Sequence, residues 1–240
     1  MIVRDRGDTW QVVLQTDHAD LSGAFARAWS KPGARHDSLS LAAARHDDGW
    51  AVWERAPTVD RGSGRPVNFL DVDVRSHLAF YRACIAAVGE QDPYAGLLVS
   101  MHGAGIYRQR YGRDPALGLS RAAEAQELVD GFVAEQEAGY PERLARVGVA
   151  EDERWLDYEL LQLYDRLSLY FCLRDVEAGE AAELQGYGLE PLGPWRVRLT
   201  PFPFGERPAR FELVRRLLRK SAGAPVLETP PERVKITIEP

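Results

Sequence analysis

Apolar and polar positions follow strand-like patterns toward the two ends of the chain and a helical pattern between them. At the amino end, Met1–Arg4 and Thr9–Gln15 have strand-like patterns and Arg6-Gly7-Asp8 supplies turn-forming residues between them, which predicts a β-hairpin. From Asp17 to about Val176, apolar residues recur at spacings of three and four, which predicts helices. These predicted helices cover the region around Leu21–Trp29, then Leu39–Trp53, Leu70–Val88, Ala95–Tyr107, Ser120–Val147 and Asp152–Val176.

Beyond Gly179 the helical period ends, and glycine and proline become frequent. Three β-like runs follow, Trp195–Phe204, Arg210–Leu218 and Val234–Glu239, which predict a small sheet that the amino-terminal hairpin completes. We therefore expect a mainly α protein with a small β appendage. The prediction is one domain over residues 1–240, with a helical core at about 16–178 and an appendage built from 1–15 and 190–240.

The polar, glycine-bearing loop at residues 56–68 is typical of a disordered connection or of a lid over a site. It lies between two predicted helices, so we expect it to select the substrate of any site that these helices form.

Composition narrows the class of protein. Hydrophobic residues make up 45% of the 240 positions and charged residues 28%, which suits a globular chain and excludes a disordered one. The formal net charge of -6 argues against general binding of nucleic acid. The start MIVRDRGD is too charged for a signal peptide and no apolar run is long enough to span a bilayer, so we expect a cytoplasmic protein with no membrane partner. Cys84 and Cys172 lie far apart and predict buried free thiols.

The chain has only five histidines, and four of them fall on apolar helix faces. His36 is the exception, because it precedes a predicted helix start at Asp37 or Ser38 and belongs to a loop. The inward-facing residues are the other four histidines and two aspartates, namely His18, His46, Asp47, His77, His102 and Asp165.

One buried histidine usually bonds to a main-chain carbonyl, and one aspartate in an apolar stripe often caps a neighbouring element. Six such residues on successive helices each need a polar partner in the interior. Shared coordination of metal ions satisfies all of them together.

The order of these six residues resembles the HD-domain superfamily of metal-dependent hydrolases, over about residues 15–176. The context is similar: Thr-Asp-His18-Ala-Asp-Leu opens a helix, His46-Asp47-Asp-Gly-Trp follows the next, and Tyr-Asp165-Arg-Leu-Ser lies on the last. Two histidines between the doublet and the last aspartate are similar to the dinuclear branch. Two departures are Trp50, where a lysine often stands, and a glycine pair after His102.

The resemblance implies an HD-domain-like helical core and two divalent ions of Fe, Mn, Zn or Ni. His18, His46, Asp47 and Asp165 would hold one ion, and Asp47 would bridge to a second held by His77 and His102. Such a centre keeps a positive charge, so we expect a small anionic substrate and hydrolysis of a phosphate ester or nucleotide by an activated water.

Further residues near the doublet and after His102 are candidates for catalysis and substrate binding. Asp47, Asp48 and Arg45 are the candidate catalytic groups. The candidate substrate contacts are Trp50, Tyr107, Arg108, Arg110 and Arg113. Two alternatives stay open: a diiron oxygenase of the inositol-oxygenase type, and a non-catalytic metal-binding or sensor protein. The sequence also leaves open whether the protein forms a homodimer.

Overall fold

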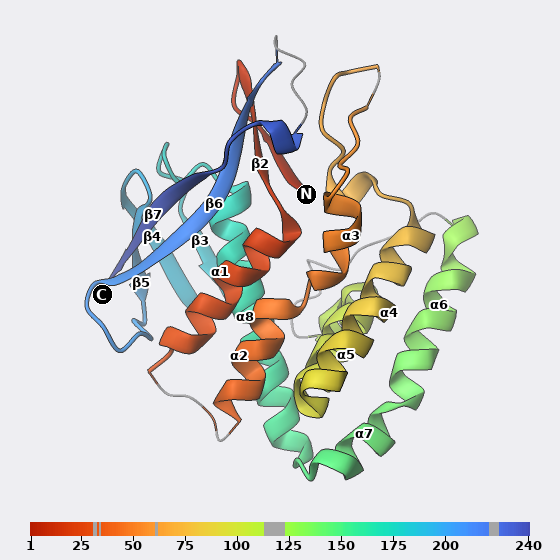
Figure 1. The fold of residues 1–240 in the computed structure, drawn as a ribbon. Coiled ribbons are helices and arrows are strands. Elements are labelled where there is room, and N and C mark those ends of the chain that lie inside the picture. Colours follow the sequence, from red (N-terminus) through yellow and green to blue (C-terminus); the bar gives the residue numbers. More distant parts are fainter. Residues whose placement is uncertain (31–32, 34, 61, 113–122, 221–225) are drawn as a thin grey trace.

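The computed structural model describes residues 1–240 except 31–32, 34, 61, 113–122 and 221–225 (Figure 1). Its α-helices are α1 (Gln15–Ala28), α2 (His36–Arg45), α3 (Ala51–Glu54), α4 (Val74–Gln91), α5 (Pro93–Tyr107), α6 (Ala123–Ala138), α7 (Tyr140–Val147) and α8 (Glu151–Leu173). The strands are β1 (Ile2–Asp5), β2 (Thr9–Val13), β3 (Ala182–Leu184), β4 (Tyr187–Gly193), β5 (Arg196–Thr200), β6 (Ala209–Arg219) and β7 (Glu232–Glu239). Short 3-10 helices are η1 (Asp48–Trp50), η2 (Phe69–Asp71), η3 (Gln109–Gly112) and η6 (Val226–Glu228).

The prediction of a mainly α, HD-domain-like core with a small β appendage is wrong, because the sheet is a large part of the fold. Seven strands form one curled, mixed sheet, a half-barrel in the order β1-β2-β6-β7-β5-β4-β3. The predicted hairpin corresponds to β1 and β2, and β2 pairs antiparallel with β6 from near the other end of the chain. β3 and β4 lie in the stretch rich in glycine and proline, where the sequence predicted no strand.

The core shows why this sheet is not an appendage. Phe25 of α1 packs edge-on against Phe211 of β6, with ring centroids 4.7 Å apart, and also contacts Phe171 of α8. Helix and strand side chains form one continuous buried cluster, which includes fully buried residues of β5, β6 and β7. α1 and α8 thus lie between the sheet and the remaining helices (Figure 1).

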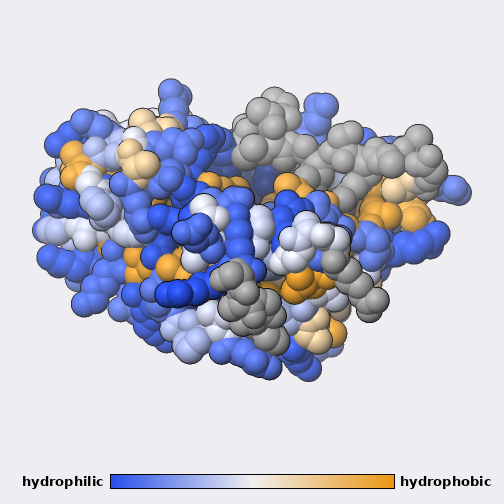
Figure 2. Space-filling model, turned by 90° about the horizontal axis from the view of Figure 1, so that it is seen from above, coloured by the Kyte–Doolittle hydropathy of each residue, from blue (hydrophilic) through white to orange (hydrophobic). Residues whose placement is uncertain are grey.

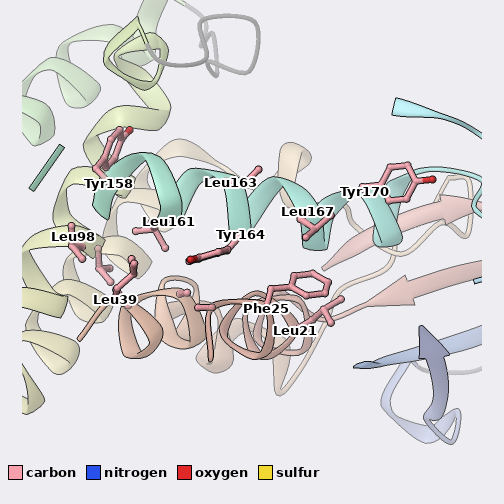
Figure 3. Packing of buried hydrophobic residues seen from close by; sticks show 14 of the residues in the cluster. Leu21, Phe25, Leu39, Leu98, Tyr158, Leu161, Leu163, Tyr164, Leu167 and Tyr170 are labelled. Carbon is pink, nitrogen blue, oxygen red and sulfur yellow. The ribbon is translucent and has the colours of Figure 1, made fainter. Parts of the chain in front are cut away.

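The helical side of the molecule is built around α5. Every residue from Tyr94 to Ile106 is buried, because five helices pack around α5, namely α2, α4, α6, α7 and α8. α8 lies over α1, with Leu161, Tyr164 and Leu167 directed toward Phe25 and its neighbours (Figure 3). A Cβ on Gly96 would lie 2.4 Å from the Gly89 Cα, so the α4–α5 crossing requires glycine there.

The predicted helix over 39–53 is interrupted at the His46-Asp47 doublet. α2 ends at Arg45, Asp47 leaves the helical conformation with φ of -116°, and η1 and α3 then continue in a new direction. Gly49 explains this path, because a Cβ there would lie 2.0 Å from the Phe80 main-chain oxygen of α4. The doublet is therefore held against α4 by a main-chain contact that only glycine permits.

Other boundaries differ from the sequence pattern in smaller ways. The predicted helix at 70–88 begins at Val74, where Asp73 caps it by accepting from the Ser76 N–H at 3.0 Å. The helix predicted over 120–147 divides at Gly139, and its predicted start at Ser120 lies outside the described residues.

The loop at 56–68 is paired across itself over its described residues. The Val67 N–H donates to the Thr58 carbonyl and the Asp60 N–H donates to the Arg65 carbonyl. It is therefore an ordered connection there. Phe69, directly after it, donates its N–H to the Met1 carbonyl at 2.8 Å, which ties the end of the loop to the sheet.

One face of the molecule is largely hydrophilic. In the face shown in Figure 2, hydrophobic side chains form small patches that are separated by polar ones. No helix among the described residues has the length and apolar character needed to cross a lipid bilayer.

Candidate metal centre

The structure buries all six residues of the predicted set. The exposed fraction of each is 4% or less. The chain supplies them from four helices and one break: His18 from α1, His77 from α4, His102 from α5, Asp165 from α8, and the His46-Asp47 doublet from the end of α2.

The tightest group consists of His18, His46 and Asp165. The two Nε2 atoms lie 3.2 Å apart, and Oδ1 of Asp165 lies 3.3 Å from Nε2 of His18 and 3.6 Å from Nε2 of His46. Tetrahedral ligation at about 2.0–2.2 Å places ligand atoms about 3.3–3.6 Å from one another. The spacing of these three atoms therefore fits a divalent cation with a fourth position open.

Hydrogen bonds behind the imidazoles determine which nitrogen faces the group. Nδ1 of His46 lies 2.9 Å from the Ala43 carbonyl, which only accepts, so this nitrogen carries the proton. Ser168 Oγ donates to the Asp165 carbonyl at 2.8 Å and so accepts from Nδ1 of His18 at 2.6 Å. In their neutral forms both rings present the lone pair of Nε2 toward Asp165, which is the tautomer that a metal ligand requires.

A second group shares His46 with the first and adds Asp47 and His102. Oδ2 of Asp47 lies 3.6 Å from the Nε2 atoms of both His18 and His46, and the rings of His46 and His102 have centroids 4.7 Å apart. Because Nδ1 of His46 is bonded to Ala43, only its Nε2 is free to bind an ion. The two groups therefore fit one shared cation better than two separate ones.

His77 lies at the same cavity but outside both groups. Its Nδ1 contacts the Tyr107 hydroxyl, and its ring packs edge-on against Tyr81 and Trp50 at 5.0 and 5.2 Å. The second ion that the family resemblance implies, held by His77 and His102, has no matching group among the described residues.

The charges of the centre are strongly coupled. Burial alone would lower the pKa of His18, but its hydrogen bonds to Asp165 and Asp47 outweigh burial and raise this pKa to about 9. Burial opposes ionisation of Asp47 and Asp165 too, yet the neighbouring cationic groups hold both carboxyl pKa values below their usual range. Burial, reinforced by His46, lowers the pKa of His102 to about 3. The two carboxylates therefore favour a positive charge at the point where these donor atoms converge.

Arg110 brings a fixed positive charge to the same place. Its Nη1 donates to Oδ2 of Asp165 at 3.0 Å and to the Gln162 side-chain oxygen, and Gln162 Nε2 in turn lies 3.2 Å from Nδ1 of His102. Gln109, Arg110 and Tyr111 all adopt the left-handed region, with φ of 50°, 50° and 53°. Such strain costs about 1–3 kcal/mol per residue and persists only where the surroundings enforce it, often at functional sites.

Arg110 and the clustered residues other than His46 line a cavity of about 280 Å³. Its polar lining is Gln15, His18, Asp47, His77, Tyr81, His102, Arg110 and Asp165. Its apolar lining is Phe69, Leu70, Ile106, Leu169 and Leu173. A hollow of about 570 Å³ between α4 and α7 is larger, but its lining contains none of the clustered histidines, so the chemistry favours the smaller cavity.

Several predicted catalytic and substrate residues do not reach the cavity. Arg45 and Asp48 pair with each other at 3.1 Å on the surface, and neither lines the cavity. Arg108 is exposed and pairs with Glu137. Trp50 and Tyr107 lie behind the lining and contact His77. Of the predicted substrate residues, Arg110 lines the cavity, and Arg113 lies outside the described residues.

Four polar residues of the site were absent from the sequence prediction: Gln15, Tyr81, Gln162 and Ser168. Helical spacing offered a signal for all four. Gln15 precedes His18 by three residues, Tyr81 follows His77 by four, and Gln162 and Ser168 precede and follow Asp165 by three. Tyr81 donates its hydroxyl to Oδ1 of Asp47 at 3.1 Å.

Comparison with known proteins gives a family but no activity. Neither a search of curated proteins nor a search of solved structures found a match to this chain. A family model described as a protein of unknown function, DUF3891, matches residues 1–220. The chain therefore belongs to the DUF3891 family.

Proposed function

We propose that the buried cluster binds a divalent cation and that the protein is a metal-dependent phosphohydrolase acting on a small phosphate ester in the cytoplasm. The observation that carries this proposal is the convergence of His18 Nε2, His46 Nε2 and Asp165 Oδ1 within 3.6 Å, with both rings oriented by their Nδ1 partners. The order of the ligands along the chain, which resembles that of HD-domain hydrolases, adds support.

His18, His46 and Asp165 would hold the ion, and Asp47, whose Oδ2 lies 3.6 Å from the Nε2 atoms of both histidines, would stay free to act as a base. A divalent cation there supplies Lewis-acid activation of water and offsets the negative charge of a phosphate. Arg110, which lines the cavity beside Asp165, orients the anionic oxygens of the substrate.

The protein groups also define the proton path of hydrolysis. Tyr81 holds Oδ1 of Asp47 and leaves Oδ2 facing the two imidazoles, where the carboxylate is placed to accept a proton from water. The water oxygen forms the new bond to phosphorus, the bond from phosphorus to the ester oxygen breaks, and the departing oxygen takes up the proton that Asp47 accepted from the water.

Metal content tests the binding part of this proposal. Protein purified without chelator is analysed for metals, and wild type is compared with His46→Ala and Asp165→Ala. His36→Ala is a matched control, because His36 begins the helix that ends just before His46 and lies outside the cluster. We expect wild type and the control to retain about one equivalent of metal and the two site variants to lose it. Equal, negligible metal in all four proteins contradicts the proposal.

A panel of phosphate esters, assayed with each candidate metal, tests the chemistry. We expect hydrolysis with zinc or manganese. Two histidines and one carboxylate are also the usual ligands of non-haem Fe(II) oxygenases, and this observation makes oxygenation the second candidate. Activity that requires iron and consumes dioxygen, with no phosphate released under any metal, would replace the hydrolase by the oxygenase.

A further inference from the structure

Two buried polar atoms that belong to residues of the cavity lining lack a hydrogen-bond partner among the described residues. They are Oε1 of Gln15, whose side chain is 4% exposed, and Nε of Arg110, which is 6% exposed. One is an acceptor and the other is a donor, and both residues line the cavity of the metal centre. Buried polar groups are nearly always satisfied, so a pair left unsatisfied at one cavity indicates a ligand with complementary polar atoms.

The other part of the cavity lining is apolar. Leu169 and Leu173 follow Asp165 on α8 at spacings of four and eight, so the face that carries the carboxylate continues as a leucine wall. Leu173 is 43% exposed, and Leu70, on η2, is 49% exposed. Few large hydrophobic side chains of this protein are so exposed, and these two border the same cavity, so its outer part is apolar and its inner part is charged.

The volume restricts what can enter. A cavity of about 280 Å³ holds roughly nine water molecules at about 30 Å³ each. Pockets for drug-sized ligands span roughly 300–1,000 Å³, so this one is at the lower limit. A nucleotide would place its base and hydroxyl-rich sugar against leucine and phenylalanine side chains, which offer them no hydrogen bonds.

We propose that the site takes a small amphiphilic phosphate monoester, whose phosphate contacts Arg110 and Gln15 and whose apolar alcohol group lies against Leu169, Leu173 and Leu70. This inference rests on the proposed function. Arg110 Nε donates to a phosphate oxygen, and Gln15 Oε1 accepts from the attacking water or from a protonated phosphate oxygen. Ester cleavage then releases inorganic phosphate and a short apolar alcohol.

Binding of non-hydrolysable alkylphosphonates tests the inference without requiring turnover. Manganese-loaded protein is titrated by calorimetry with methyl-, butyl-, hexyl- and decylphosphonate, and with a hydroxylated analogue of the butyl compound. Each methylene that becomes buried is expected to raise the affinity about four-fold. We expect the affinity to rise up to a chain that fills the cavity and then to level off, and the hydroxylated analogue to bind at least ten-fold more weakly than butylphosphonate.

Matched variants locate the apolar contact. Leu173→Ser should weaken hexylphosphonate about ten-fold and leave methylphosphonate unchanged. Leu156→Ser is the control, because Leu156 is 61% exposed on the same helix and does not line the cavity. Gln15→Leu should weaken all phosphonates to a similar degree, and retained metal content shows that this variant is folded.

The outcomes separate this inference from the proposed function. Equal affinities for methyl- and hexylphosphonate, or tighter binding of adenosine monophosphate than of hexylphosphonate, overturn the amphiphilic substrate while a metal-dependent hydrolase stands. An affinity that still rises at decylphosphonate overturns the small substrate in favour of a lipid phosphate that extends beyond the mouth. Absence of bound metal and of any phosphate release overturns the proposed function itself.

Discussion

Replacing Ser168 by alanine tests whether the hydrogen bonds behind the cluster prepare it for a cation. Ser168 accepts from Nδ1 of His18 at 2.6 Å and donates to the Asp165 carbonyl, so it links two of the proposed ligands. The variant leaves the Nδ1–H of His18 without its partner in a site where the ring is 1% exposed. The alternative tautomer moves the proton to Nε2, where it opposes cation binding.

The magnitude follows from this geometry. A buried donor that loses its only acceptor costs about 1–3 kcal/mol of the free energy of unfolding. For a chain of this size, each kcal/mol lowers the melting temperature by about 2–4 °C. Loss of a hydrogen bond that orients a metal ligand also weakens metal affinity about 10–100-fold. Ser168→Ala should therefore be less stable in the presence of chelator and should bind manganese more weakly.

Ser22 offers a matched control on α1. It is fully buried and follows His18 by one helical turn, but its hydroxyl has no hydrogen-bond partner among the described residues. Ser22→Ala removes the same atom and relieves an unsatisfied polar group, so we expect stability to be unchanged or raised and metal affinity to be unchanged. Calorimetric melting with chelator and titration with manganese measure both quantities. Equal effects of the two substitutions would refute the role of Ser168 in orienting His18.

Three further predictions concern packing, pH and metal removal. Gly49→Ala should lower the free energy of unfolding by about 1–3 kcal/mol in urea denaturation, because the new Cβ would lie 2.0 Å from a main-chain oxygen of α4. Gly131→Ala in α6 is the control. A Cβ there has nothing within 4 Å, so this substitution should raise the free energy of unfolding by about 0.5–1 kcal/mol. A hydrogen bond from Arg6 lowers the pKa of Glu177 to about 2. The contribution of the Glu177 carboxylate to stability is therefore complete above about pH 4.5 and declines as the pH falls toward 2. Glu177→Gln should reduce the dependence of the melting temperature on pH over this range, and an unchanged pH profile would argue against the ion pair. Chelator should lower the melting temperature of wild type but not of Asp165→Ala. A metal ion present at 100 times its Kd stabilises the folded state by about 2.7 kcal/mol, and the chelator removes this contribution. An equal response of both proteins would exclude Asp165 as a ligand of the ion.

Helical spacing predicted which faces of the helices turn inward, because that information is local. His18, His77, His102 and Asp165 each share a face with apolar neighbours within a turn or two, and burial of that face brings each side chain to the interior. The roles of Arg45 and Asp48 could not be predicted in the same way. Arg45 is the last residue of α2, and Asp48 follows the break in the helix, where Gly49 contacts Phe80 of α4, 31 residues further along the chain.

The sheet could not be predicted from periodicity because its pairing is non-local. β2 pairs with β6 across about 200 residues, and β5 pairs in parallel with β7 although β6 intervenes in the chain. Glycine and proline in β4 removed the strand signal there, since both residues are rare in strands. Strand patterns at the two ends of the chain indicated β structure but not one sheet that carries part of the core.

The sheet also bears on the metal centre, because it positions two of the proposed ligands. α1, which carries His18, and α8, which carries Asp165, both pack against the sheet, and Phe25 of α1 contacts both Phe211 of β6 and Phe171 of α8. The doublet, in contrast, is held from the helical side through the contact of Gly49 with α4. A cation at the cluster would therefore connect the sheet-supported helices to the α2–α4 side.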